Sequence, residues 1–109
     1  MAEGEGNESC YLSQLNLSKR DFSGANFNFA NFFGSIFFES NCRGADFHNA
    51  NLHLVSAYKA DFSNTEMFGA NLSSLILREV NFSGAVFGAT TIAGVNLESV
   101  KGLDSAHHK

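Results

Sequence analysis

An apolar residue recurs at every fifth position along almost all of this sequence. Counted from Leu12 to Leu97, all 18 positions of this frame are apolar: Leu12, Leu17, Phe22, Phe27, Phe32, Phe37, Cys42, Phe47, Leu52, Ala57, Phe62, Met67, Leu72, Leu77, Phe82, Phe87, Ile92 and Leu97. In a chain with 44% apolar residues, chance would produce such a run about once in a few million frames. The fold must therefore repeat every five residues.

Two other positions of each five-residue unit also keep their chemical character. Two residues before the frame, the side chain is usually small or β-branched: Ala25, Ala30, Ala45, Ala50, Ala60, Ala70, Ala85, Val55, Val80, Val95 and Val100. Between the two lies mostly Asn or Asp: Asn16, Asp21, Asn26, Asn31, Asn41, Asp46, Asn51, Asp61, Asn71, Asn81 and Asn96. This triplet predicts a short strand, because residues two apart point to the same side of a strand.

Neither a helix nor a straight strand can bury one residue in five. Five helical residues turn by ~500°, which leaves successive frame residues about 140° apart, and an odd spacing alternates between the faces of a strand. The chain must therefore turn a corner within each unit. Gly or Asn, which tolerate positive φ, stand at the expected corners 24, 34, 44, 49, 64, 69, 84 and 94.

Four such corners close a square coil of about twenty residues, and successive coils stack through strand-type hydrogen bonds at ~4.8 Å. The absence of Pro fits this ladder, which needs its backbone N–H donors. In this arrangement Cys42 is a small core residue, and a corner residue such as Ser63 faces solvent.

Runs such as Ala25-Asn26-Phe27, Ala60-Asp61-Phe62 and Ala70-Asn71-Leu72 resemble the pentapeptide-repeat family, whose pattern is A(D/N)LXX. The resemblance covers about residues 11–99. It implies an all-β fold, a right-handed quadrilateral β-helix of about 4.5 coils with four pentapeptides each. Ile36, Ile76 and Val86 depart from the pattern at positions that should be polar. Arg20 occupies an inward position from which we expect it to reach solvent or the Glu-rich N-terminal tail.

The sequence predicts three segments. Residues 1–10, with Glu3, Glu5 and Glu8, form an acidic tail that we expect to be flexible. Residues 11–99 form the repeat, and residues 100–109 form an exit or cap, in which Gly102 breaks the frame and Leu103 folds over the last coil. An open coil end needs a cover, so either the end pairs with another copy or the chain is a piece of a longer protein.

Composition excludes several classes of function. From Tyr11 onward seven Lys/Arg face eight Asp/Glu, which gives no basic footprint for direct nucleic-acid binding. No apolar run approaches the ~20 residues that span a bilayer, and the acidic first ten residues do not resemble a signal peptide. Two Cys separated by 31 residues make no disulfide framework. We therefore expect a cytoplasmic protein that does not act on a membrane.

The residues that carry chemistry do not form a catalytic or metal-binding pattern. His48 and His53 lie one unit apart, so a corner separates them and joint chelation of a metal is awkward. The abundant Ser residues fall at corners, where they bond turns locally, and the Asp residues are expected to accept backbone N–H groups near the corners. The sequence predicts no catalytic residue, no cofactor and no metal, and hence not an enzyme.

Large apolar side chains in outward positions are the exceptions that point to function. Stacking at a period of twenty brings several to one side of the rod: Phe33, Ile36, Phe38, His53, Tyr58 and Ile76. A contiguous aromatic patch of this kind marks an interaction surface, although cross-coil stacking that only stiffens the ladder is the alternative.

Two classes of function remain. The first is a non-catalytic scaffold that binds an unknown protein partner, or a second copy of itself through an end of the rod or the aromatic face. The second follows from the resemblance, since some members of the family mimic duplex DNA and bind DNA gyrase; that activity needs an acidic rod. An accessory module cut from a larger multidomain protein is a further alternative.

Overall fold

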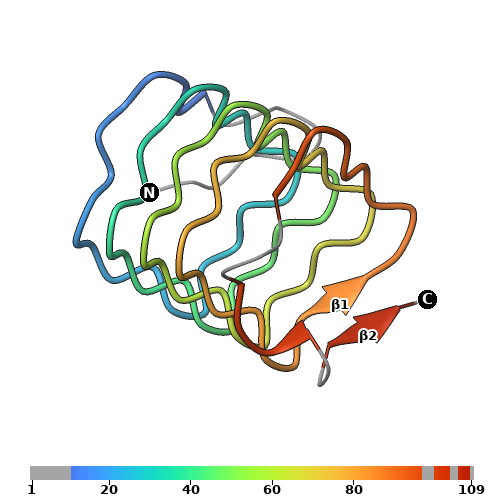
Figure 1. Cartoon of the computed structure of the whole chain (residues 1–109). Helices are drawn as coiled ribbons and strands as arrows, with labels where there is room; N and C mark the ends of the chain where they lie inside the picture. Colours follow the sequence, from blue (N-terminus) through green and yellow to red (C-terminus); the bar gives the residue numbers. More distant parts are fainter. Residues whose placement is uncertain (1–10, 97–99, 104–105, 109) are drawn as a thin grey trace.

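The chain winds into a coil whose successive turns lie on one another, as Figure 1 shows. This computed structural model describes residues 11–96, 100–103 and 106–108. Parallel bridges join residues twenty apart, from the pair Tyr11 and Asn31 to the pair Asn81 and Lys101. The two strands among the described residues, β1 (Val86–Phe87) and β2 (His107–His108), pair in parallel near the C-terminal end. The predicted twenty-residue period is confirmed.

The bridged residues form four rows, which we number as faces in chain order. Face 1 holds Tyr11, Asn31, Asn51, Asn71 and Thr91; face 2 holds Asn16, Ile36, Ser56 and Ile76; face 3 holds Asp21, Asn41, Asp61, Asn81 and Lys101; face 4 holds Asn26, Asp46, Glu66, Val86 and His107. Each row is tied by backbone bonds, such as Leu12 N–H to the Asn31 carbonyl at 2.8 Å. A Pro within these rows would remove a donor.

A corner follows each face and has the number of that face. Corner 1 holds residues 13–14, 33–34, 53–54, 73–74 and 93–94; corner 2 holds 18–19, 38–39, 58–59 and 78–79; corner 3 holds 23–24, 43–44, 63–64 and 83–84; corner 4 holds 28–29, 48–49, 68–69 and 88–89. At every corner described, the second residue has positive φ, including all eight predicted Gly and Asn positions. A typical corner closes by a bond from Ala25 N–H to the Phe22 carbonyl at 3.0 Å, with Gly24 at φ 69°, as a type II turn requires.

The inward positions of the frame form one continuous core. From Leu17 to Phe87 every frame residue is buried, and the larger rings stack across coils, as Phe62 does on Phe82 at 5.5 Å between ring centroids. Ala57 and the larger Val55 beside it are both fully buried. Cys42 is buried as predicted.

Small polar residues also enter the core, where a backbone carbonyl accepts each hydroxyl. Ser40 Oγ donates to the Leu17 carbonyl at 2.6 Å, and Thr65 Oγ1 donates to the Phe62 carbonyl at 2.7 Å. Among the described residues no buried side-chain N or O atom lacks a partner. The hydroxyls therefore take the small inward slot without an unsatisfied polar group.

Two predictions about burial were wrong. Ile92 is 42% exposed rather than buried, because it tops its column above Leu72 and faces an apolar cavity of about 260 Å³ instead of another coil. Ser63 is buried rather than solvent-facing, because its short side chain folds back onto Asp61, with Oγ to Oδ1 at 2.6 Å, between two coils. Arg20 is exposed, as predicted.

The C-terminal segment departs from the repeat where the sequence predicts it. Asn81 pairs with a residue twenty further on, whereas Val86 pairs with His107, twenty-one further on. Between the two pairs, Gly102 has φ 79°, and a Cβ there would come within 2.5 Å of the Ser83 backbone nitrogen, so this position accepts only Gly. Leu103 packs against the core, as predicted. The predicted acidic tail and Leu97 lie outside the described residues.

Candidate protein-interaction surface

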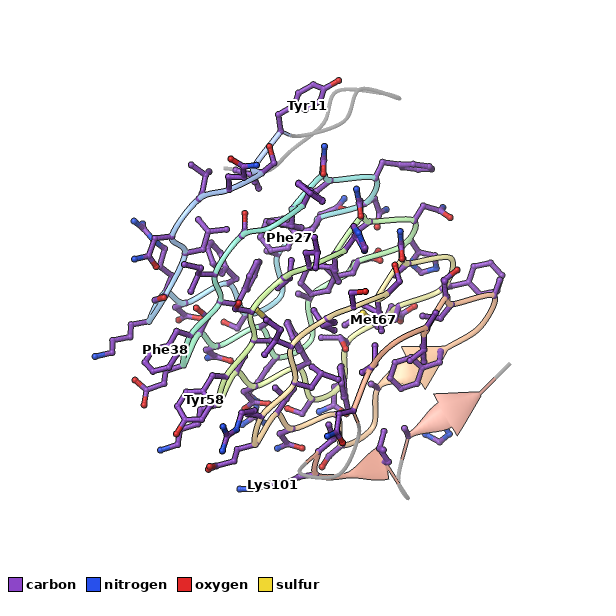
Figure 2. The ribbon with its side chains drawn as sticks, turned by 45° about the horizontal axis from the view of Figure 1, so that its top comes forward. Tyr11, Phe27, Phe38, Tyr58, Met67 and Lys101 are labelled. Carbon is purple, nitrogen blue, oxygen red and sulfur yellow. The ribbon has the colours of Figure 1, made fainter. Side chains whose placement is uncertain are left out.

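The six residues predicted to form the interaction surface lie on face 2 and on the two corners that bound it. Ile36 and Ile76 belong to face 2, where Ser56 separates them in the row. The remaining four are two on corner 1, Phe33 and His53, and two on corner 2, Phe38 and Tyr58. We call this set the face-2 surface. Figure 2 shows the two labelled rings of corner 2 side by side on the outside of the coil.

On corner 2, Phe38 and Tyr58 form a stacked pair. Their ring centroids lie 4.9 Å apart at an interplanar angle of 23°, and Phe38 remains 37% exposed. Two cations lie over the Tyr58 ring, Lys59 Nζ at 5.3 Å and the Arg78 guanidinium carbon at 6.0 Å from the centroid. These distances allow cation–π attraction, so this corner presents rings and cations together.

On corner 1, Phe33 and His53 are a second pair, with ring centroids 5.6 Å apart. Here the histidine is tethered, because His53 Nδ1 lies 2.9 Å from both the carbonyl and the hydroxyl oxygen of Ser73. Both rings are only half exposed. On face 2, Ile36 and Ile76 are 39% and 50% exposed. The structure thus brings the six residues to one side of the rod, with the most open aromatic pair on corner 2.

Sequence reasoning did not select a column of charged residues that lies beside this aromatic pair. The second residues of corner 2 are Lys19, Glu39, Lys59 and Glu79, one above the other at a period of twenty, with Lys19 Nζ 3.8 Å from Glu39 Oε1. We call them the corner-2 charge column. Its signs alternate, which avoids like charges on neighbouring coils. The signal was present in the sequence, since the same twenty-residue period orders these residues.

Asn and Asp residues of the faces support the corners that follow them, as Asn16 on face 2 does by accepting the Ser18 N–H at 3.1 Å. Asp21 Oδ1 accepts the Ser23 N–H at 3.0 Å and the Ser23 hydroxyl at 2.7 Å, which is the predicted role of the repeat Asp. Both bonds, the hydroxyl first, hold the pKa of the Asp21 carboxyl below its ordinary value. On face 2, Ile36 and Ile76 have no oxygen with which to accept an N–H from corner 2. Corner 2 therefore lacks this support at two of its coils.

The histidines and the buried cysteine of the described residues do not gather at one site. Within them, no three His, Cys, Asp or Glu side chains are close enough to share a metal ion. His48 instead contacts Asp46 at 2.5 Å on corner 4, away from His53 on corner 1. Burial raises the pKa of the Cys42 thiol, reinforced by the charges of Asp61 and Asp21, and a protonated thiol is a poor nucleophile.

No helix in the described part of the chain is long and apolar enough to cross a bilayer. What the structure presents instead is a stacked coil of five-residue units with an apolar, partly cationic surface on one side.

A family model described as pentapeptide repeats matches eight copies over residues 8–38, 35–73 and 65–101. The chain belongs to the pentapeptide-repeat family, as its sequence pattern indicated.

Several solved structures are similar to this one. HetL from the cyanobacterium Nostoc sp. strain PCC 7120, a pentapeptide-repeat protein involved in heterocyst differentiation regulation, is 21% identical over 89% of this chain, with a TM-score of 0.68. Rfr23 from the cyanobacterium Cyanothece 51142 is 26% identical over 92% of this chain and 60% of its own, with a TM-score of 0.57. The protein alr5209 from Nostoc PCC 7120 is 17% identical over 91% of this chain and 84% of its own, with a TM-score of 0.62.

This chain spans 48% of the length of HetL. The similarity to these structures is a similarity of fold. A search of the curated proteins found no match.

Proposed function

We propose that this chain is a non-catalytic scaffold in the cytoplasm that binds a protein, either an unknown partner or a second copy of itself, through the face-2 surface. We further infer that the coil is right-handed, as the family resemblance implies. The observation that carries the proposal is the Phe38–Tyr58 stack, with Phe38 exposed and with Lys59 and Arg78 over the Tyr58 ring. Aromatic and Arg side chains contribute most of the binding energy in protein interfaces.

The environment of this stack supports binding better than a purely structural role. If the rings only stabilised the stacked coils, we would expect the preceding face to carry side chains that hydrogen-bond the corner. Corner 3 has such side chains in Asp61 and Asn81, which accept the backbone N–H groups of Ser63 and Ser83. Corner 2 instead has Ile36 and Ile76 beneath it, each more than a third exposed. The chain thus replaces locally stabilising residues by apolar ones beside its stacked Phe38–Tyr58 pair, and surfaces of this kind are typical of interaction sites.

Mimicry of DNA receives less support from the charges. A duplex mimic needs columns of like negative charge, whereas the corner-2 charge column alternates between Lys and Glu. Arg43 and Arg78 add further cations to the outside of the rod. An acidic enzyme-binding surface is therefore the weaker proposal.

A paired substitution tests the proposed surface. Phe38→Ser with Tyr58→Ser should abolish partner binding and self-association, because it removes the aromatic anchors, while the thermal unfolding of the coil changes little. The matched control is Phe29→Ser with Phe68→Ser on corner 4, where the rings are 49% and 43% exposed. Sedimentation measures self-association. Partner binding is measured with a protein first captured from cell extract, identified, and then purified for titration.

Equal loss of binding in both pairs of variants would mean that the face-2 surface is not the specific binding site. Loss of several kcal/mol of stability in the corner-2 pair alone would show that these rings are structural, and the proposal would fail.

A further inference from the structure

The corner-2 charge column combines charge with an unfavourable backbone. Among the described residues with positive φ, the charged ones are Lys19, Glu39, Lys59 and Glu79, with φ between 56° and 57°. On corner 3 the equivalent positions are Gly24, Gly44, Asn64 and Gly84, the residue types that adopt this conformation most easily. Four successive coils of corner 2 thus place a charged side chain where Gly would be less strained.

The attraction between Lys19 and Glu39 explains little of this choice. The ion pair between Lys19 and Glu39 has an N–O distance of 3.8 Å, and the Lys19 side chain is 71% exposed. Exposed pairs of this geometry contribute little to stability. Uncharged residues would avoid repulsion equally well, and the alternating signs also match a partner outside the column.

The order of the charges is self-complementary when the rod is turned end for end. Along the column the signs are plus, minus, plus, minus, so an inverted second copy has a negative charge wherever the first has a positive one. Lys19 then faces Glu79 of the second copy, and Glu39 faces Lys59 of the second copy. Equal spacing of the coils, ~4.8 Å in both copies, allows all four levels to match at once. If the two rods were parallel with their columns in contact, every charge would face a charge of the same sign.

The same inversion places the aromatic pair at the centre. Phe38 and Tyr58 occupy the two middle levels of their column, so Phe38 of one copy lies against Tyr58 of the other. Ser18 and Arg78 occupy the outer levels. An apolar centre with a polar rim is the usual anatomy of a protein interface, and a two-fold axis closes the pair without leaving a free surface to propagate.

We propose that the partner of corner 2 is a second copy of this chain, paired antiparallel about a two-fold axis perpendicular to the rod, with the corner-2 charge column selecting that orientation. This rests on the proposed function of the face-2 surface and specifies its occupant.

Reversing the whole column tests the pairing without disturbing alternation in the coil. The variant carries Lys19→Glu, Glu39→Lys, Lys59→Glu and Glu79→Lys. It should fold and self-associate like the unmodified chain, because its own order of charges is also self-complementary. A mixed pair, however, places like charges opposite each other at every level. After mixing equal amounts of the two proteins, native mass spectrometry should show mixed dimers at least ~10-fold below the statistical half.

Each other outcome overturns the proposal. A statistical fraction of mixed dimers would show that the column does not select the partner. Pairing through a coil end would give this result. An excess of mixed dimers would show parallel rods. A monomeric unmodified chain at high micromolar concentration would exclude a second copy, while the titration of an identified partner with the Phe38 and Tyr58 variants would still test the face-2 surface itself.

Two single variants give an independent measurement if the fourfold variant does not fold. Lys19→Glu places two negative charges opposite each other in its own pair, and Glu79→Lys places two positive ones. Each should self-associate more weakly than the unmodified chain, and an equimolar mixture of the two should recover association, because the exchanged charges match again. No recovery in the mixture would contradict antiparallel pairing.

Discussion

Corners 2 and 3 bound the same face of the rod and differ in almost every stabilising detail. Corner 3 has Gly or Asn at its positive-φ positions, and the preceding Asp or Asn supports each turn, as Asn81 does for the N–H and hydroxyl of Ser83 at 2.9 and 2.6 Å. Corner 2 has Lys or Glu at those positions and Ile at two of the supporting ones. Corner 3 agrees with local physical preference at each step, and corner 2 departs from it repeatedly.

This difference separates the residues that the fold requires from the residues that serve the surface. A coil of pentapeptides needs a turn at every corner, and corner 3 satisfies the need at the least cost in strain and unsatisfied polar groups. Corner 2 forms the same turn with residues that add strain, and it is the corner that exposes a stacked aromatic pair beside alternating charges. Departures from local consistency concentrate where a protein has another use for its surface.

The largest expected effect tests whether the difference is confined to the surface. Phe37 lies beneath corner 2 and Phe62 beneath corner 3, and both are fully buried. Phe37→Ala and Phe62→Ala should each cost about 3–5 kcal/mol of unfolding free energy, because the stacked core cannot collapse around the cavity. Phe38→Ala, on the surface, should cost at most about 1 kcal/mol. Denaturant titration of the three variants measures these values.

A much smaller cost for Phe37→Ala than for Phe62→Ala would change the comparison. It would mean that corner 2 is poorly packed throughout, so that its unusual residues reflect a loose region rather than a binding surface.

An intermediate effect concerns the side chains that support the corners. Asp61 Oδ1 accepts the N–H of buried Ser63 at 3.0 Å and its hydroxyl at 2.6 Å. Asp61→Ala should therefore cost about 1–3 kcal/mol by leaving both donors unsatisfied. On corner 2, Ile76→Asn should instead gain about 1 kcal/mol by supplying an acceptor for the Arg78 N–H. Thermal and denaturant unfolding of both variants measures the two changes in unfolding free energy, which should have opposite signs. Changes of the same sign would contradict the distinction between the corners.

The period of the sequence was sufficient to predict the coil, its corners and its core. Each of these depends on a local rule that repeats: Phe62 is inward because its whole column is inward, and Gly44 has positive φ because every fifth residue does. At the C-terminal end the sequence predicted the break at Gly102 and the packing of Leu103, but not the details of the local structure. Ile92 keeps the pattern but lies beside a cavity, and the pairing of Val86 with His107 shifts by one residue after Gly102.

The candidate surface was predicted less completely than the fold. Reading at a period of twenty placed Phe38 near Tyr58, because residues on successive coils are neighbours. It did not show that Arg78 and Lys59 lie over the Tyr58 ring, since the side-chain rotamers that set those contacts depend on the local turn. The corner-2 charge column was visible in the sequence, but its meaning depends on the positive φ of its members, which mark it as strained.

The smallest expected effect exchanges the positive-φ residues of the two corners. Lys59 has φ 57° and Gly44 has φ 68°, and a Cβ on Gly44 would meet no atom within 4 Å. Lys59→Gly should raise the free energy of unfolding by up to about 1 kcal/mol, because Gly adopts this conformation without the strain of a side chain. Gly44→Lys should lower it by about 1 kcal/mol for the same reason, since space is not limiting there.

Self-association should move in the opposite direction to stability. Lys59→Gly removes one charge of the corner-2 charge column and one cation over the Tyr58 ring, so the more stable chain should be the weaker dimer, whereas Gly44→Lys should leave the dimer unchanged. Denaturant titration and sedimentation of the same two samples measure both quantities. If Lys59→Gly raises the free energy of unfolding and leaves self-association unchanged, then the strained backbone at Lys59 does not serve binding. Corner 2 would then differ from corner 3 in sequence but not in function.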